Sequence, residues 1–195
     1  DLTAGGRMDR GQVVVVTKAG YLQGSALEES RRRKEAGRPW PELVEYAPGL
    51  EHCIHPEFLA HSLTGSLERL GQARVEGFLL HNPEYYLGWA AKAGVEPAQA
   101  RAEYHRRLAA AFAHLEAEAD AGRIGWYGVS SNTFPTPAED PEHTSLERLA
   151  GLAGEVSPNH RFRAVQLPLN LLEPGAAALA IPPSGAPCLQ AARRL

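Results

Sequence analysis

The sequence is poor in cysteine, has no dominant charge and lacks long apolar runs. Its two cysteines, Cys53 and Cys188, lie far apart with no CxxC neighbour, which excludes a disulfide framework or a cysteine zinc motif and predicts a reducing, cytoplasmic location. Its 20 basic and 23 acidic residues give a net charge of −3, so neither a nucleic-acid surface nor a membrane surface is indicated. No signal peptide is evident, and no apolar run reaches the roughly 20 residues that a membrane span needs.

Short apolar runs alternate with helical patterns along the chain. The expected strands cover residues 13–18, 75–80, 124–129 and 162–167, and the expected helices cover 55–70, 101–121 and 144–154. A buried parallel strand is a short, continuous apolar run, whereas an amphipathic helix repeats its apolar residues every three or four positions. Alternation of this kind predicts an α/β fold with a parallel sheet and helical crossovers.

Three segments lie outside this alternation. Residues 19–54 are rich in glycine and proline and are expected to form a long, irregular, lid-like insertion. Residues 82–100 are expected to be a second loop, and residues 176–195 an atypical tail that follows neither period. The aromatic residues of the first two segments leave two interpretations open, a substrate wall or solvent-shielding packing; they are Trp40, Tyr46, Tyr85, Tyr86 and Trp89.

Polar side chains stand at the ends of the expected strands. Lys18 follows four valines, His81 follows two leucines, and Ser131 and Asn132 follow the third strand. Reactive groups of a (β/α)8 barrel sit at such carboxyl ends, so these residues are candidates for one active site. The structural alternatives stay open: a solvated strand end for Lys18, a hydrogen-bonded core position for His81, and a turn or helix cap for the Ser-Asn pair. Gln166, in an expected buried strand, needs a partner in the fold or in an amide-bearing ligand.

Five segments together resemble the aldo-keto reductases. They are VVTKAG (15–20), SLERLG (66–71), FLLHNP (78–83), GRIGWYGVSSN (122–132) and VQLPLN (165–170). They occur in the family's order with suitable spacing, and the resemblance spans about residues 10–175. The resemblance implies a (β/α)8 TIM barrel that transfers hydride from NADPH, or from NADH, to a small-molecule aldehyde or ketone.

The resemblance also implies roles for the residues at the strand ends. Lys18 matches the lysine that tunes the catalytic acid, and His81 matches the histidine that orients the carbonyl. Ser131 and Asn132 match the pair that holds the nicotinamide carboxamide, with Gln166 beside them. A donor placed in advance at the carbonyl oxygen stabilises the negative charge that develops there as hydride arrives.

The chain departs from the family pattern at both ends. The family's tyrosine acid and its aspartate partner lie upstream of the lysine, yet the residues before Lys18 contain no tyrosine, and Tyr21 lies in the insertion. The strands that bind the cofactor's phosphates and adenosine have no counterpart after about residue 176. We therefore expect residues 1–195 to be a single partial barrel domain with about strands three to six, a fragment that is inactive alone.

Two other functions stay open. One is a non-catalytic binding or regulatory module related to the aldo-keto reductases, which the missing tyrosine favours if the chain is complete. The other is a metal-dependent hydrolase that uses His52, His55, His61 and His81, which is disfavoured because His55 and His61 lack the i, i+4 spacing of a helical metal pair. Substrate identity and oligomeric state are not predicted.

Overall fold

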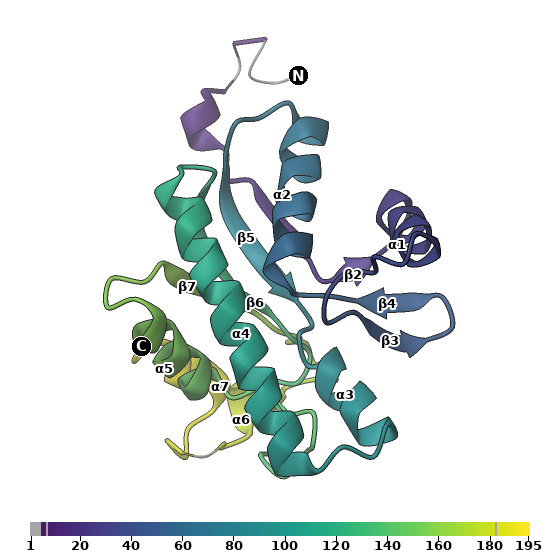
Figure 1. The fold of residues 1–195 in the computed structure, drawn as a ribbon. Helices are drawn as coiled ribbons and strands as arrows, with labels where there is room; N and C mark the ends of the chain where they lie inside the picture. Colours follow the sequence, from purple (N-terminus) through teal and green to yellow (C-terminus); the bar gives the residue numbers. More distant parts are fainter. Residues whose placement is uncertain (1–4, 7, 182) are drawn as a thin grey trace.

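A computed structural model describes residues 5–6, 8–181 and 183–195, and its centre is a parallel sheet (Figure 1). The four strands are β1 (Val16–Ala19), β5 (Val75–His81), β6 (Ile124–Ser130) and β7 (Phe162–Gln166), in the order β1-β5-β6-β7. All three neighbouring pairs are parallel. The predicted α/β alternation with a parallel sheet is therefore confirmed.

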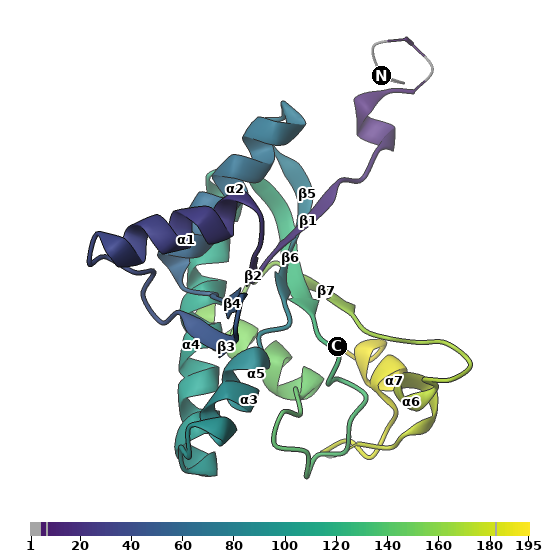
Figure 2. The ribbon, with the colours of Figure 1, turned by 90° about the vertical axis from the view of Figure 1, so that its right-hand side faces the viewer.

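Three helices connect these strands and lie on one face of the sheet. They are α2 (Pro56–Leu70), α4 (Pro97–Asp120) and α5 (Leu146–Val156). Figure 1 shows them in front of the strands, and Figure 2, turned by 90°, shows α2 and α4 together on one side. The core lies between the two layers, and its fully buried side chains include Phe58, Leu63, Phe78, Leu80, Leu108, Phe112 and Tyr127.

Local sequence signals set the ends of these helices. Pro56 occupies the first turn of α2, and Gly71 closes that helix in the left-handed conformation (φ 61°), which glycine adopts without strain. The Ser145 hydroxyl accepts a hydrogen bond from the Arg148 backbone at 3.2 Å and caps α5. The three predicted helices are confirmed, with ends shifted by up to a few residues.

The segment 19–54 is not irregular, so that part of the prediction was wrong. It contains β2 (Tyr21–Leu22), α1 (Ser25–Glu35), β3 (Val44–Ala47) and β4 (Leu50–His52), and its strands form an antiparallel sheet in the order β2-β4-β3. The strands are only two to four residues long, too short for a period-two pattern to stand out among the glycines and prolines. Whether this insertion acts as a lid stays a prediction.

The insertion is fastened to the helical layer. Trp40 is 3% exposed and packs edge-on against Phe58 of α2, with their ring centres 5.5 Å apart. Arg107 of α4 donates to the Glu42 carbonyl at 3.0 Å, and Arg106 forms an ion pair with the Glu42 carboxylate. Trp40 therefore serves packing rather than a substrate wall.

The prediction that residues 82–100 form a loop was also wrong. It holds α3 (Tyr85–Lys92) and the first turn of α4, which begins at Pro97. Pro83 precedes α3 and Pro97 occupies the first turn of α4, so both prolines sit where a helix tolerates them. The tail contains the short helices α6 (Gly175–Ala178) and α7 (Cys188–Ala192), with Cys188 buried.

The two outer strands are more exposed than a buried parallel strand would be. Val16 of β1 is 44% exposed and Gln166 of β7 is also exposed, contrary to the prediction for these strands; Val14, predicted to be in the first strand, lies before β1 and is 68% exposed. The reason is their place in the sheet, since β1 pairs with β5 and β7 with β6, each on one side only among the described residues. None of the helices in the described ranges is long and apolar enough to cross a membrane.

Candidate active site

The parallel register brings the candidate residues to one edge of the sheet. Lys18 lies opposite Leu79 near the end of β1, and His81, Ser130 and Gln166 end the next three strands in register with one another. Because parallel strands point the same way, all of these side chains belong to the carboxyl-terminal edge. This is the edge that carries the active site in α/β barrels.

Lys18 and Gln166 meet across this edge although their strands are not neighbours. The Lys18 ammonium donates a hydrogen bond to the Gln166 side-chain oxygen at 3.0 Å. Both residues are exposed, so this single contact is worth little stability. Gln166 is exposed and so does not need a protein partner, yet its oxygen accepts from Lys18 and its amide nitrogen is left as a donor.

His81 is a half-buried imidazole at the end of β5. Burial lowers its pKa from the ordinary value, and the positive charge of Lys18 lowers the pKa further. Both effects favour a neutral ring at pH 7, the form that can donate one proton and accept another. The ring lies edge-on to Tyr21 with 4.6 Å between centres.

A second histidine, His52, holds the backbone of His81. Its Nε2 lies 2.7 Å from the His81 carbonyl oxygen, an arrangement in which Nε2 carries the proton and donates it. His52 is 1% exposed, and burial lowers its pKa to about 4, so the ring is neutral at pH 7. Gly20 makes this contact possible, because a Cβ there would lie 2.3 Å from the same carbonyl oxygen.

Ser131 and Asn132 follow β6 directly but differ in exposure. Ser131 is 1% exposed; its backbone N–H donates to the Gln166 carbonyl at 3.0 Å, and its hydroxyl lies 3.1 Å from that of Thr133. Asn132 is exposed, and its backbone N–H donates to the Glu84 carboxylate at 3.0 Å. Asn132 is thus exposed at the site, while its backbone N–H is bound by the buried carboxylate of Glu84.

Sequence reasoning missed several residues that support the site. Asn82, in the left-handed conformation (φ 48°), donates from its side chain to the Tyr21 hydroxyl at 2.9 Å. Burial raises the Tyr21 pKa above its usual range, so its hydroxyl keeps its proton. The Asn-Pro pair after β5 signalled a turn. No sequence signal marked His52 or Glu84 as neighbours of this edge, because they come from separate elements.

Aromatic rings from two segments gather beside His81. Tyr85 lies edge-on to Tyr21 at 5.0 Å and stacks on Tyr46 at 4.4 Å. Tyr86 and Trp89 pack on each other at 5.9 Å, and Arg107 covers Tyr86. Among the predicted wall residues, Tyr46 and Tyr85 are therefore the two that the structure joins to the candidate site.

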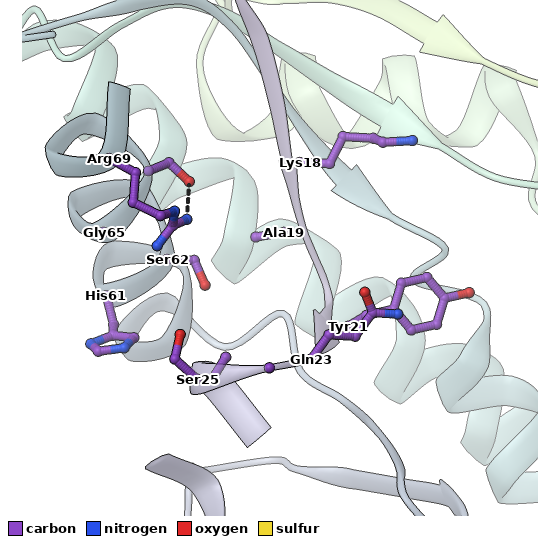
Figure 3. A pocket seen from close by; sticks show the side chains of 12 residues that line it. Lys18, Ala19, Tyr21, Gln23, Ser25, His61, Ser62, Gly65 and Arg69 are labelled. Carbon is purple, nitrogen blue, oxygen red and sulfur yellow. Dashed lines mark hydrogen bonds between the residues drawn. The ribbon is translucent and has the colours of Figure 1, made fainter. Parts of the chain in front are cut away.

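A cavity of about 400 Å³ borders the site on the other side of β1. Its lining includes Ser25 at the start of α1, and His61 and Arg69 of α2. Figure 3 shows β1 running between this α2 face and the Lys18 side chain, which extends away from Arg69. The Lys18 ammonium therefore contacts Gln166 and points away from the cavity, although Lys18 is among the residues that line it.

The histidines of the hydrolase alternative are engaged elsewhere. His52 donates to the His81 carbonyl, and the His55 ring accepts from the Glu57 backbone at 3.3 Å at the start of α2. His61 lies beside Trp40 with 5.2 Å between ring centres. Across the described residues, no three histidine, cysteine or acidic side chains are grouped to hold a metal ion. Nothing in this geometry supports the hydrolase.

Comparison with known proteins identifies the family. The family model described as the aldo/keto reductase family matches residues 2–171. No curated protein matches the chain. Among solved structures, PA4992 of Pseudomonas aeruginosa, which its name assigns to the aldo-keto reductases, is 18% identical with a TM-score of 0.39; the match covers 96% of this chain and 67% of that one. A structural likeness this weak adds nothing to the family match.

Proposed function

The chain belongs to the aldo/keto reductase family, and from this membership we propose that it supplies part of a (β/α)8 barrel that reduces an aldehyde or ketone with NADPH, or with NADH. The observation that carries the proposal is the placement of Lys18, His81, Ser131 and Gln166 at the carboxyl edge of one parallel sheet. An oxidoreductase role follows from the family. The substrate class and the cofactor are our inference.

The residues present suit a nicotinamide carboxamide. Asn132 offers an exposed amide, and Gln166, whose oxygen is taken by Lys18, has its amide nitrogen left as a donor. Ser131 is fixed by its backbone bond to Gln166, so the three residues are tied together at the end of β6 and β7. In the proposed enzyme, the bound cofactor supplies the hydride.

His81 and Lys18 have different roles in this proposal. The neutral His81 ring donates a hydrogen bond to that oxygen and orients the carbonyl group. The Lys18 ammonium lowers the pKa of the acid that protonates this oxygen, as expected for the lysine that Lys18 matches. The oxygen must then receive a proton, and we assign that step to a group contributed by the remainder of the barrel.

The open edges of the sheet support the assignment of the proton donor to further strands of the barrel. β1 and β7 each have one described neighbour, and Val14 and Val16 expose apolar surface beside the free edge. A barrel removes such edges by closing the sheet on itself. We therefore propose that further strands complete the barrel and that this chain alone does not turn over. The buried free thiols Cys53 and Cys188 suit a reducing, cytoplasmic compartment.

The proposal is tested by cofactor binding and by turnover. Once the missing strands are added, NADPH fluorescence should report binding, and absorbance at 340 nm should fall with an aldehyde. In that complete protein, Lys18→Met and His81→Gln should each lower kcat at least about tenfold. A complete protein that binds no NADPH would refute the proposal.

A non-catalytic binding module is the second candidate. It is favoured by Tyr21, whose ring packs on His81, because burial raises the pKa of its hydroxyl and makes it a weaker proton donor. NADPH binding without any oxidation in the complete protein, across several aldehydes and ketones, would establish this alternative.

A further inference from the structure

Glu84 is a buried carboxyl group that the proposed reaction does not use. It precedes α3 and is 2% exposed. Its Oε1 accepts from the Asn132 backbone at 3.0 Å, whereas Oε2 is buried without a hydrogen-bond partner among the described residues. A carboxyl buried in this way is costly, and a surface position would avoid the cost. The burial of Glu84 therefore needs an explanation in terms of what its carboxylate does.

The contact of Glu84 joins the two loops that carry the candidate site. Glu84 follows His81 by three residues, in the loop after β5, and Asn132 lies in the loop after β6. The same loops are also joined by the Asn82 backbone N–H, which donates to the Ser130 carbonyl at 2.7 Å. The Asn82 bond continues the strand pairing, whereas the Glu84 bond fixes the exposed residue beyond it.

We propose that Glu84 is a positioning residue that holds the backbone of Asn132 and so sets the place of the carboxamide-binding pair relative to His81. This inference rests on the proposed function, in which Ser131 and Asn132 hold the nicotinamide. Glu84 touches neither substrate nor cofactor. It acts through the Asn132 backbone, whose N–H would otherwise lack this acceptor at the base of the site.

The environment of Glu84 couples this contact to pH. Burial raises the Glu84 pKa to about 7; hydrogen bonding to backbone N–H groups, including that of Asn132, and to the Ser131 side chain lowers it, and the negative charge of Glu142 raises it. The other titratable groups that face it are Tyr104 of α4 and Tyr21 of β2, whose phenols stay protonated at neutral pH. The Asn132 amide should therefore sense a titration close to neutral pH.

The first arm of the test follows the Asn132 amide by ¹H–¹⁵N NMR between pH 5 and 9. In the unchanged chain its chemical shift should move with a midpoint near the Glu84 pKa of about 7. Glu84→Gln should abolish this transition, whereas Glu142→Gln should keep it and move the midpoint to lower pH. An Asn132 shift that titrates in Glu84→Gln as it does in the unchanged chain would overturn the proposal.

The second arm measures NADPH dissociation constants in the complete protein, to which the missing strands have been added. Glu84→Ala should weaken binding about tenfold because the Asn132 backbone loses its acceptor, and Glu84→Gln, which keeps an acceptor oxygen, should stay within about threefold. Glu142→Ala, which removes a neighbouring carboxylate, should change binding less than about twofold. A folded Glu84→Ala protein that binds as tightly as the unchanged chain would refute the positioning role. Absence of NADPH binding by the complete protein without substitutions would instead count against the proposed function.

Discussion

Polar candidate residues stand at the ends of all four parallel strands, but their surroundings differ. The strands β5 and β6 are central in the sheet, and β1 and β7 are its outer strands. At the central strands, Ser131 is 1% exposed and the His81 backbone is held by His52. At the outer strands, Lys18 and Gln166 are exposed and share one side-chain hydrogen bond. The central half of the site is buried in the fold, whereas the two side chains of the outer half are exposed and contact each other.

This contrast shows where preorganisation comes from. A strand with neighbours on both sides and helices above it fixes the backbone of the residue at its end. A strand with one described neighbour leaves its terminal side chain free to adjust. The comparison predicts that changes in the central half alter the folding free energy, and that changes in the outer half alter the electrostatics of the site with little effect on stability.

The largest contrast is expected between core and edge truncations. Phe78→Ala removes a fully buried ring from β5 and should lower the free energy of unfolding by about 3–5 kcal/mol. Val16→Ala, at a side chain that is 44% exposed on β1, should cost less than about 1 kcal/mol. Urea denaturation followed by circular dichroism measures both. Equal losses would remove the distinction between the two halves.

The next effect concerns the pH dependence of stability through Glu84. Its pKa is raised from 4.5 to about 7 on folding, so the folded state binds the extra proton and its stability falls as pH rises between these values. Between pH 5 and pH 8 the free energy of unfolding of Glu84→Gln should gain roughly 2–3 kcal/mol relative to the unchanged chain. Urea titrations at the two pH values give the difference. A constant difference would contradict the raised pKa.

A smaller effect is expected at the junction between the insertion and β5. An added Cβ at Gly20 would lie 2.3 Å from the His81 carbonyl oxygen and 2.7 Å from the His52 ring nitrogen, so Gly20→Ala should cost about 1–3 kcal/mol and displace His81. Gly11→Ala is the matched control, because an added Cβ at that position would have nothing within 4 Å. Thermal unfolding and the His81 ring resonances distinguish them, and similar melting temperatures would argue against the close approach.

The smallest change in stability is expected at Lys18. Lys18→Met removes an exposed charge and should alter the free energy of unfolding by less than about 0.5 kcal/mol. The same change should raise the pKa of His81, because the Lys18 charge is one of the two causes that lower it. An NMR titration of the His81 ring measures this shift. A His81 pKa that stays the same would show that the Lys18 charge does not act on the His81 ring.

The strand ends and main helices could be predicted from the sequence because their signals are local. Continuous apolar runs marked β5 and β6, and a glycine at the end of α2 marked where that helix stops. The polar residues after those runs identified Lys18, His81 and the Ser131–Asn132 pair as candidates before any tertiary contact was known. Their catalytic and cofactor-binding roles remain proposals.

The insertion and the supporting residues could not be predicted in the same way. The strands of the insertion are two to four residues long and pair with each other rather than continue a sequence period. The exposure of Val14 and Val16 depends on how many neighbours β1 has, and an apolar run looks the same at an edge and at a centre. Both predictions failed for one reason. The strand that pairs with each segment, or that is missing beside it, cannot be identified from the residues next to it in the sequence.

The sequence by itself determined the alternation of strands and helices and the polar groups at the strand ends, because these depend on residues close together in the chain. Only the tertiary structure decided that Lys18 reaches Gln166, that His52 holds the His81 carbonyl and that Glu84 holds Asn132. Each of these contacts joins separate elements, and the closest pair is separated by 29 residues. Side-chain partners at that distance are fixed by the packing of the sheet and the insertion, since no local pattern encodes them.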